Sequence, residues 1–272
     1  MKIKPMNKID RIVIIIMILI GIYLFVSAPV ALDDEQQQKG QRIPVKLMFQ
    51  IVAEENNRIR KQWTKHIVGE GKNVGFHFGE NWRKKGEDKG PLPALFLREV
   101  AAYLEKSPVS LSLFLGSDFP INRANKFKGF QAEIFQIMKK TNQNQYFFDN
   151  EVQRYTAMFP DNVVVSTCAS CHNEHPDTPK KDWVMGDMMG ATTWAYPKDT
   201  LTRDELIMII SELRHAFAKT YTAFVQKSQT FVNKPLVGEQ WPVDGYFLPS
   251  VGVFMQRFEK SAAESTLNLL LK

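Results

Sequence analysis

Residues 168–172 are Cys168-Ala169-Ser170-Cys171-His172, and they contain the only two cysteines of the chain. The spacing C-x-x-C-H is the pattern to which c-type haem is attached. Residues three positions apart lie on one face of a helical turn, so each thiol can add to one vinyl group of a haem while the next residue offers its imidazole to the iron. We therefore expect Cys168 and Cys171 to anchor one covalent haem c, with His172 as the proximal iron ligand.

Three other uses of the same segment compete with haem attachment. A zinc site would combine the two cysteines with His172 and His175, but structural zinc sites separate their two ligand pairs by about a dozen residues. A thioredoxin-like redox pair does not require a histidine after its second cysteine. A disulfide closing so short a loop would be strained and would stabilise little. Haem is favoured because it gives every fixed position of the motif a chemical role.

A second informative stretch lies near the N-terminus. Residues 12–32 carry no charge, and their number is close to the ~20 apolar residues that cross a bilayer. Basic residues precede the stretch and acidic residues follow it: Lys2, Lys4, Lys8 and Arg11, then Asp33, Asp34 and Glu35. By the positive-inside rule, these charges predict a single-pass helix in the inner (cytoplasmic) membrane, with a cytoplasmic N-terminus and a periplasmic soluble domain.

The same stretch could instead be a cleaved signal peptide. Val26-Ser27-Ala28 has the small-residue spacing of a signal peptidase site, but Pro29 follows it directly. The apolar run is also longer than a usual signal core, so we expect an uncleaved anchor. Export agrees with haem attachment, because c-type cytochromes mature outside the cytoplasm and an oxidising compartment disfavours an unused cysteine pair.

The composition limits the classes of function. The chain is 44% hydrophobic with a formal net charge of +6, as expected for one main globular domain. No cluster of Lys and Arg is interleaved with aromatic residues, so we expect no nucleic-acid partner. No catalytic triad, phosphate-binding loop or pair of carboxylates stands out, so we predict that the protein is not an enzyme.

Hydrophobic periodicity predicts a mixed α/β (α+β) domain. We expect strands over residues 109–115, 146–148, 151–159 and 188–196, with a hairpin at Asp149-Asn150. The glycine-rich residues 70–90 predict a long loop. Helices are expected over residues 47–68, 94–106, 127–140, 201–232 and 253–271, the fourth opened by a capping box at residues 202–205.

Several separated motifs give the chain a family resemblance. The haem motif continues as CHNEHPDTPKKDW to residue 183, and it is accompanied by PLPALFLRE (91–99), DFPIN (118–122) and GDMMG (186–190). In this order the motifs resemble the Tll-like haem-c domain family over residues 47–197. The resemblance implies a PAS-like exported domain with one haem c, found alone on a membrane anchor or as the input domain of chemoreceptors and histidine kinases. We accordingly divide the chain into an anchor (1–32), a linker (33–46), a haem domain (47–197) and a C-terminal helical extension (198–272).

A haem needs an apolar wall and partners for its propionates. Large aromatic residues could supply the wall, although such residues are more often ordinary core. Basic residues could pair with the propionates, although a solvated surface charge is the usual role of each. The candidates for the wall are Phe76, Trp183, Phe78, Trp194, Phe147 and Phe148, and those for the propionates are Arg98, Arg123, Lys180 and Lys181.

The sequence leaves the sixth iron ligand open. Some relatives use a cysteine of the N-terminal helix, but both cysteines here belong to the motif. His77, flanked by Phe76 and Phe78, is the first candidate and His66 the second, although a lone histidine is usually structural. Met185, Met188 and Met189 are further candidates, with core packing as their ordinary role. An open sixth position would favour gas binding.

Two functions follow from these expectations. The first is an electron-transfer or redox accessory cytochrome on one membrane helix, with a protein redox partner or membrane complex that it contacts through its C-terminal helices. The second is a periplasmic haem-based sensor of redox poise or a diatomic gas, which signals through a separate partner. The absence of an output domain from the sequence favours the first, and the PAS-like resemblance favours the second.

Overall fold

The computed structural model describes residues 7–27, 42–242 and 247–270. It divides into two units, residues 1–41 and residues 42–272. The first unit contains helix α1 (Lys8–Ser27), whose large apolar side chains are exposed, from 41% at Ile14 to 85% at Phe25. Of the helices that the structure describes, none has the length and apolarity needed to cross a membrane. The predicted span is therefore not supported, and residues 28–32 of it lie outside the described residues.

The second unit is built on a four-stranded antiparallel sheet of order β4-β7-β6-β5. Its strands are β4 (Ser112–Gly116), β5 (Gln145–Asp149), β6 (Arg154–Asn162) and β7 (Met188–Tyr196). The predicted hairpin is confirmed, but its turn covers residues 150–153 and its second strand begins at Arg154, not at residue 151. Asp149 Oδ1 accepts a hydrogen bond from the Glu151 N–H at 3.0 Å, and the turn ends at Gln153 with φ 55°. Gly190 has to be a glycine, because a Cβ there would lie 2.3 Å from Gly116 O of the neighbouring strand.

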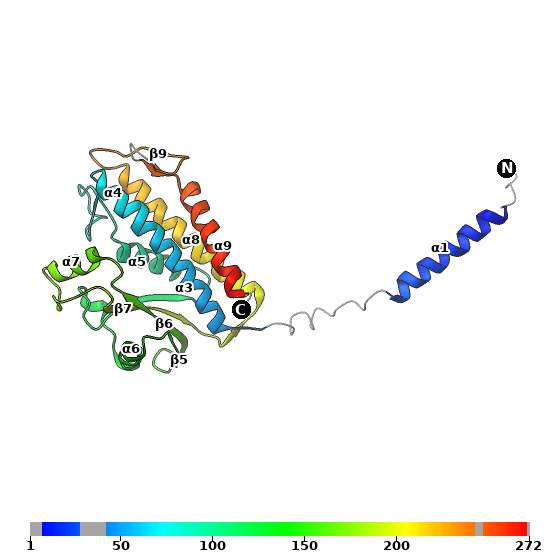
Figure 1. The fold of residues 1–272 in the computed structure, drawn as a ribbon, viewed down its shortest axis with the longest axis horizontal. Helices are drawn as coiled ribbons and strands as arrows, with labels where there is room; N and C mark the ends of the chain where they lie inside the picture. The colour runs from blue at the N-terminus through cyan, green and yellow to red at the C-terminus, as the bar shows by residue number, and fades with distance from the viewer. Residues whose placement is uncertain (1–6, 28–41, 243–246, 271–272) are drawn as a thin grey trace. The chain divides into compact units, whose positions relative to one another are not determined.

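Helices cover both faces of the sheet (Figure 1). One face carries α3 (Val45–Gln62), α5 (Pro93–Leu104), α8 (Arg203–Ser228) and α9 (Val251–Leu270), and the other carries α6 (Gly129–Thr141). The predicted capping box opens α8, where Thr202 Oγ1 accepts from the Glu205 N–H and Glu205 Oε2 accepts from the Thr202 N–H. The mixed α/β class is thus confirmed.

The main core lies between α3 and the helices around it. Trp63 is fully buried, stacks on Phe96 of α5 with ring centroids 4.7 Å apart, and meets Phe224 of α8 edge-on at 5.0 Å. Tyr221 of α8 stacks on Phe254 of α9 at 3.9 Å. The helices that follow residue 197 therefore pack on α3 as part of the same compact unit.

Several boundaries differ from those expected. The helix predicted over residues 47–68 begins at Val45 and changes at residue 63 to a π-helical turn, η1 (Trp63–Gly69). Residues 70–90, predicted as a loop, begin with α4 (Glu70–Asn73) and contain the short parallel strands β2 (His77–Phe78) and β3 (Lys89–Gly90). The strand predicted over 109–115 starts only at Ser112. The remaining short elements are β1 (Ile43–Pro44), β8 (Thr200–Leu201), β9 (Val237–Gly238), β10 (Leu248–Pro249) and the 3-10 turn η2 (Arg123–Asn125).

Candidate functional site

The C-x-x-C-H motif forms its own helix, α7 (Ser166–Glu174), shortly after the end of β6. The helix begins after Val165, whose extended backbone accepts a hydrogen bond from the Cys168 N–H at 3.0 Å, and it ends where His175 becomes extended. Both thiols are free, so no disulfide joins them. Cys168 is half-buried and Cys171 is exposed. The motif therefore presents its two sulfur atoms from one short helix, as thioether formation requires.

A small apolar cluster packs α7 against the rest of the domain. It consists of the buried residues Val163, Ala169 and Trp183, with Cys168 and Met189 packed against them. Ala169 is one of the contacts of the helix with the domain, because it is only 8% exposed and belongs to this cluster. Packing at Ala169 leaves Cys171 at the surface.

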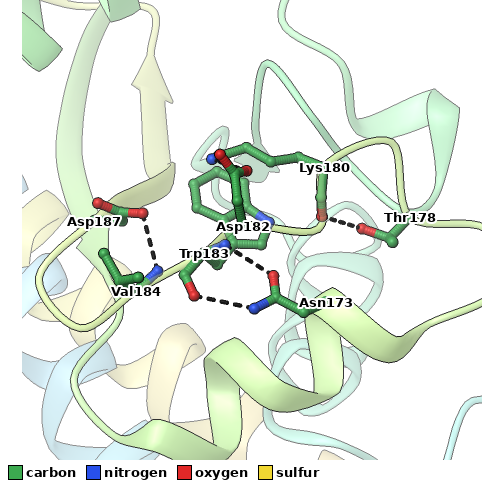
Figure 2. Close-up of polar contacts among 7 residues, drawn as sticks. All are labelled: Asn173, Thr178, Lys180, Asp182, Trp183, Val184 and Asp187. Carbon is green, nitrogen blue, oxygen red and sulfur yellow. Dashed lines mark hydrogen bonds and ion pairs between the residues drawn. The ribbon is translucent and has the colours of Figure 1, made fainter.

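The loop after the motif folds back onto α7 (Figure 2). Asn173 Nδ2 donates to Trp183 O at 3.0 Å, and the Trp183 N–H donates to Asn173 Oδ1 at 2.9 Å. Within the loop, Thr178 Oγ1 donates to Lys180 O at 2.8 Å, and the Val184 N–H donates to Asp187 Oδ2 at 3.0 Å. The residue after His172 is therefore held to a segment ten residues further along the chain.

Backbone hydrogen bonds join the same loop to the residue that follows β6, and the loop also contains an ion pair. The Val163 N–H donates to Asp187 O at 2.9 Å and the Gly186 N–H to Val163 O at 3.0 Å, with Gly186 in the left-handed region at φ 90°. Lys180 pairs with Asp182, and its Nζ lies 4.5 Å from the centroid of the Trp183 ring. Trp183 is thus covered by a cation on one side and by α7 on the other.

A second ion pair lies close to the motif. Arg60 of α3 donates from Nη2 to Asp161 Oδ1 of β6 at 2.6 Å. Burial lowers the pKa of His172, an effect that the negative charge of Asp161 opposes. Burial raises the pKa of the Cys168 thiol, an effect that the charge of Arg60 opposes. A lowered histidine pKa keeps the imidazole neutral, which is the form that binds a metal.

The structure separates the two predicted distal histidines. His77 lies in β2 and is exposed. Glu80, three residues later, has its Oε1 3.5 Å from Nε2 of His175, the C-cap residue of α7. The segment that carries His77 therefore adjoins the motif helix. His66 lies in η1, where Nδ1 is 2.6 Å from Glu70 Oε1 and the ring meets Trp241 edge-on at 5.7 Å.

The predicted aromatic wall is divided among several places. Trp183 lies directly against α7, whereas Trp194 and Phe78 belong to the main core. Phe147 packs against Phe130 on the α6 side of the sheet. Phe76 is half-buried in the turn after α4, where its N–H donates to Gly71 O at 2.8 Å. Phe148 meets Tyr155 of the neighbouring strand edge-on, with ring centroids 4.9 Å apart. The cluster beside the motif helix contains one member of this set, Trp183, together with Ala169 and Cys168.

Arg98, Arg123 and Lys180 each line a cleft, whereas Lys181 is an exposed surface residue that lines none of these three. A cleft of about 660 Å³ lies between residues 118–126, which include Arg123, and residues 176–179 of the loop after α7. A cleft of about 340 Å³ adjoins it over Trp183 and includes Lys180. Arg98 lines a third cleft of about 440 Å³ together with Glu80. Both arginines are exposed.

The donor set fits a covalently attached haem. Two free thiols lie three residues apart on one helix, and the half-buried imidazole of His172 makes no hydrogen bond or ion pair with another described residue. In the cluster against α7, Trp183 Nε1 is a buried polar atom that has no hydrogen-bond partner among the described residues. Within the described ranges, no group of three or more His, Cys, Asp or Glu is arranged to hold a metal ion alone. A porphyrin, which supplies four nitrogen ligands itself, matches one imidazole and two thiols better than zinc does.

Sequence reasoning did not identify Arg60, Asp161 or Asn173. Asn173 could have been noticed, because it directly follows the iron-ligand position of the motif. Arg60 and Asp161 are 101 residues apart, and no local pattern relates them.

The chain was also compared with known proteins. The model of a family described as Tll0287-like matches residues 35–197. No curated protein and no solved structure matches the chain.

Proposed function

The chain belongs to the Tll0287-like family, a haem-binding, cytochrome-like family, and from this premise we propose that it is a monohaem c-type cytochrome. The observation that carries the proposal is helix α7, which presents two free thiols and a half-buried imidazole within five residues, the imidazole having no hydrogen-bond partner in the part of the chain that the structure describes. Cys168 and Cys171 would form the two thioethers, and His172 would be the proximal ligand.

The chemistry of attachment uses both thiols in the same way. Each S–H adds across one vinyl double bond, with the sulfur bonding to one carbon and the hydrogen going to the other, so no atom is lost and no oxidant is needed. When bound, the haem supplies an iron that exchanges one electron between its ferric and ferrous states. The chain's own part is to fix the orientation of α7, through Ala169 and Asn173, and to keep His172 neutral and available.

We propose electron transfer as the role of this centre. Apolar side chains are exposed on both sides of α7 in the sequence, at Val164, Val165, Val184 and Met185, and Cys171 is exposed as well. A haem fastened at Cys171 would have an edge near the surface, where a redox partner can approach. The partner would be a protein, either a soluble carrier or a membrane complex.

Attachment to a membrane is a separate proposal. The exposed apolar side chains of α1, the basic residues before it and the acidic residues after residue 32 support an anchor in the inner membrane with the haem domain in the periplasm. Covalent haem attachment is consistent with this location.

A haem-based redox or gas sensor with a PAS-like domain is the second candidate. It is favoured by the position of the histidines, since His66 Nδ1 already has Glu70 as a partner and His77 is exposed. If neither binds the iron, the sixth position is open to a small ligand. Ferrous protein that binds CO or NO rapidly would support sensing, whereas an unresponsive six-coordinate haem would support electron transfer.

The test of the main proposal is chemical. The full chain is produced in cells that mature c-type cytochromes, denatured in acid and analysed by mass and absorbance. We expect the mass of one haem to remain with the polypeptide, and we expect the double variant Cys168→Ala/Cys171→Ala to carry none. A wild-type chain that loses all its porphyrin on denaturation would refute covalent attachment. His215→Ala, on the exposed surface of α8, is the matched control.

A further inference from the structure

Strand β5 (Gln145–Asp149) forms one edge of the four-stranded sheet (Figure 1). It pairs with β6 on one side, from Gln145 opposite Met158 to Asp149 opposite Arg154. On its other side, no described strand pairs with it, and no backbone group of a described loop forms a hydrogen bond with it. The outward N–H and C=O groups of β5 therefore form a row with which another strand can pair.

The sequence of β5 lacks the features that usually prevent edge pairing. Its residues are Gln-Tyr-Phe-Phe-Asp, with no lysine, proline or glycine. Its pairing with β6 runs in one continuous register without a β-bulge. The opposite edge of the sheet differs, because the Ser117 N–H at the end of β4 donates to Asn125 O at 3.0 Å and Ser117 O accepts from the Phe127 N–H at 3.1 Å. β5 is therefore the unprotected edge of this sheet.

Three consecutive aromatic side chains at the centre of β5 are half-buried. Tyr146 packs against the main core, on the α3 side of the sheet. Phe147 meets Phe130 of α6 on the other side, with ring centroids 5.5 Å apart. Phe148 meets Tyr155 of β6, with ring centroids 4.9 Å apart. Each of the three keeps some exposed area, so a further strand beside β5 would remove apolar area from water on both faces of the sheet.

We propose that β5 pairs with β5 of a second copy of the chain in an antiparallel two-fold arrangement, which joins the two sheets into one. A second copy fits because identical strands in this arrangement complement each other. With the two-fold axis at Phe147, Tyr146 lies opposite Phe148 of the partner subunit, an aromatic pair, and Gln145 lies opposite Asp149 of the partner subunit. An amide thus faces a carboxylate, and no two like charges are opposed.

The proposed contact leaves the cysteine motif free. β5 pairs with residues 154–158 of β6, whereas α7 follows the opposite end of that strand, after Asn162. Dimerisation and haem attachment are therefore separate properties, and the inference does not rest on the proposed function. One pair of short strands is a small interface, so we expect a dimer that dissociates on dilution.

Cysteine cross-linking of the full-length holoprotein in detergent tests the contact and its register. Directly opposed residues of an antiparallel pair have Cα atoms about 4.5–5.5 Å apart, a separation that a disulfide spans. Phe147→Cys should therefore give a covalent dimer on mild oxidation, because residue 147 lies opposite itself. Gln145→Cys is the matched control at the same edge: its two copies would be about 13 Å apart along the strands, and it should give no covalent dimer. The wild type controls for cross-links through Cys168 or Cys171.

Light scattering measures the strength of the contact. Phe147→Lys brings two lysines opposite each other, and we expect it to raise the dimer dissociation constant at least about tenfold. Phe130→Ala removes the ring that Phe147 meets but leaves the edge intact, and it should dimerise as the wild type does. Hydrogen exchange of the wild type gives a second readout, because the backbone amides of residues 145–149 should be better protected at high protein concentration than at low.

A covalent dimer of Phe147→Cys but not of Gln145→Cys, with concentration-dependent protection of β5, supports the inference. A wild type that stays monomeric at every concentration overturns it, as does equal cross-linking of the two cysteine variants. A dimer that Phe147→Lys leaves unchanged also overturns it, because the two copies would then meet at another surface. If the variants at residue 147 do not accumulate, hydrogen exchange of the wild type decides alone, and protection that is independent of concentration overturns the inference. The haem content of the wild type is measured separately, and absence of covalent haem would refute the proposed function instead.

Discussion

Asn173 and Trp183 are joined by two hydrogen bonds, one in each direction, between the side-chain amide of Asn173 and the backbone of Trp183 (Figure 2). The nitrogen and the oxygen of one carboxamide thus tie the last turn of α7 to the returning loop. Since Asn173 directly follows His172, this pair also limits how far the proposed iron ligand can rotate.

Asn173→Ala should therefore destabilise the domain. Loss of the carboxamide leaves the Trp183 N–H and C=O without partners, a cost of about 1–3 kcal/mol in unfolding free energy. Urea denaturation followed by tryptophan fluorescence measures the effect. Asn173→Asp keeps the acceptor and loses the donor, so it should lower the unfolding free energy by less than Asn173→Ala does. Equal decreases in unfolding free energy in the two variants would contradict a role for both hydrogen bonds.

His77→Ala tests the sixth ligand. If His77 binds the iron, its removal converts a low-spin absorption spectrum to a high-spin one and opens the haem to CO. The matched variant His66→Ala removes the histidine that Glu70 holds at 2.6 Å, and we expect it to leave the spectrum low-spin. A His77→Ala spectrum identical to that of the wild type would eliminate His77 as the ligand.

Glu205 makes the stability of α8 depend on pH. Its pKa is held below the ordinary value mainly by Lys198 and by the Thr202 N–H. A depressed folded-state pKa adds stability that is complete above the ordinary glutamate pKa and is lost as the pH falls through the folded value. The pair is largely at the surface, so the contribution is about 1 kcal/mol or less. The urea midpoints of the wild type and Glu205→Gln should differ at pH 7 and become equal at pH 3. A difference in midpoint that is the same at both pH values would show that the lowered pKa of Glu205 is not its cause.

Trp63→Ala should be the most damaging single change in the main core. The indole is fully buried between Phe96 and Phe224, so truncation leaves a cavity and costs about 3–5 kcal/mol. Ile207→Ala, at an exposed position of α8, should change stability by no more than about 0.5 kcal/mol. Thermal melts of the two variants give the comparison, and equal melting temperatures would contradict the assignment of Trp63 to the core.

Replacing residues 1–41 by a cleavable export signal should release the haem domain from the membrane fraction. Residues 42–272 form a compact unit of their own, so the released protein should keep its haem and its melting temperature. Fractionation of cells by ultracentrifugation checks the location. Haem protein that still sediments with membranes would show that α1 is not the attachment.

The sequence predicted most regular elements because their signals are local. The strand predicted at 188–196 is confirmed as β7, and the pattern of the helix predicted over 201–232 is confirmed as α8, with its capping box at Thr202 and Glu205. Predicted boundaries were wrong where tertiary packing decided the local structure. The helix becomes π-helical at Trp63, which packs between α5 and α8. Strand β4 begins at Ser112, because its pairing with β7 begins there.

The chain's amino-acid order alone predicted covalent haem attachment, since two thiols and an imidazole lie within five residues of one short helix whatever surrounds them. Only the tertiary structure decided which groups neighbour that helix. Arg60 meets Asp161 across 101 residues because sheet register and the packing of α3 set which side chains face each other, and neither is a property of a short segment. For the same reason only the fold showed that the helices after residue 197 complete the core around α3.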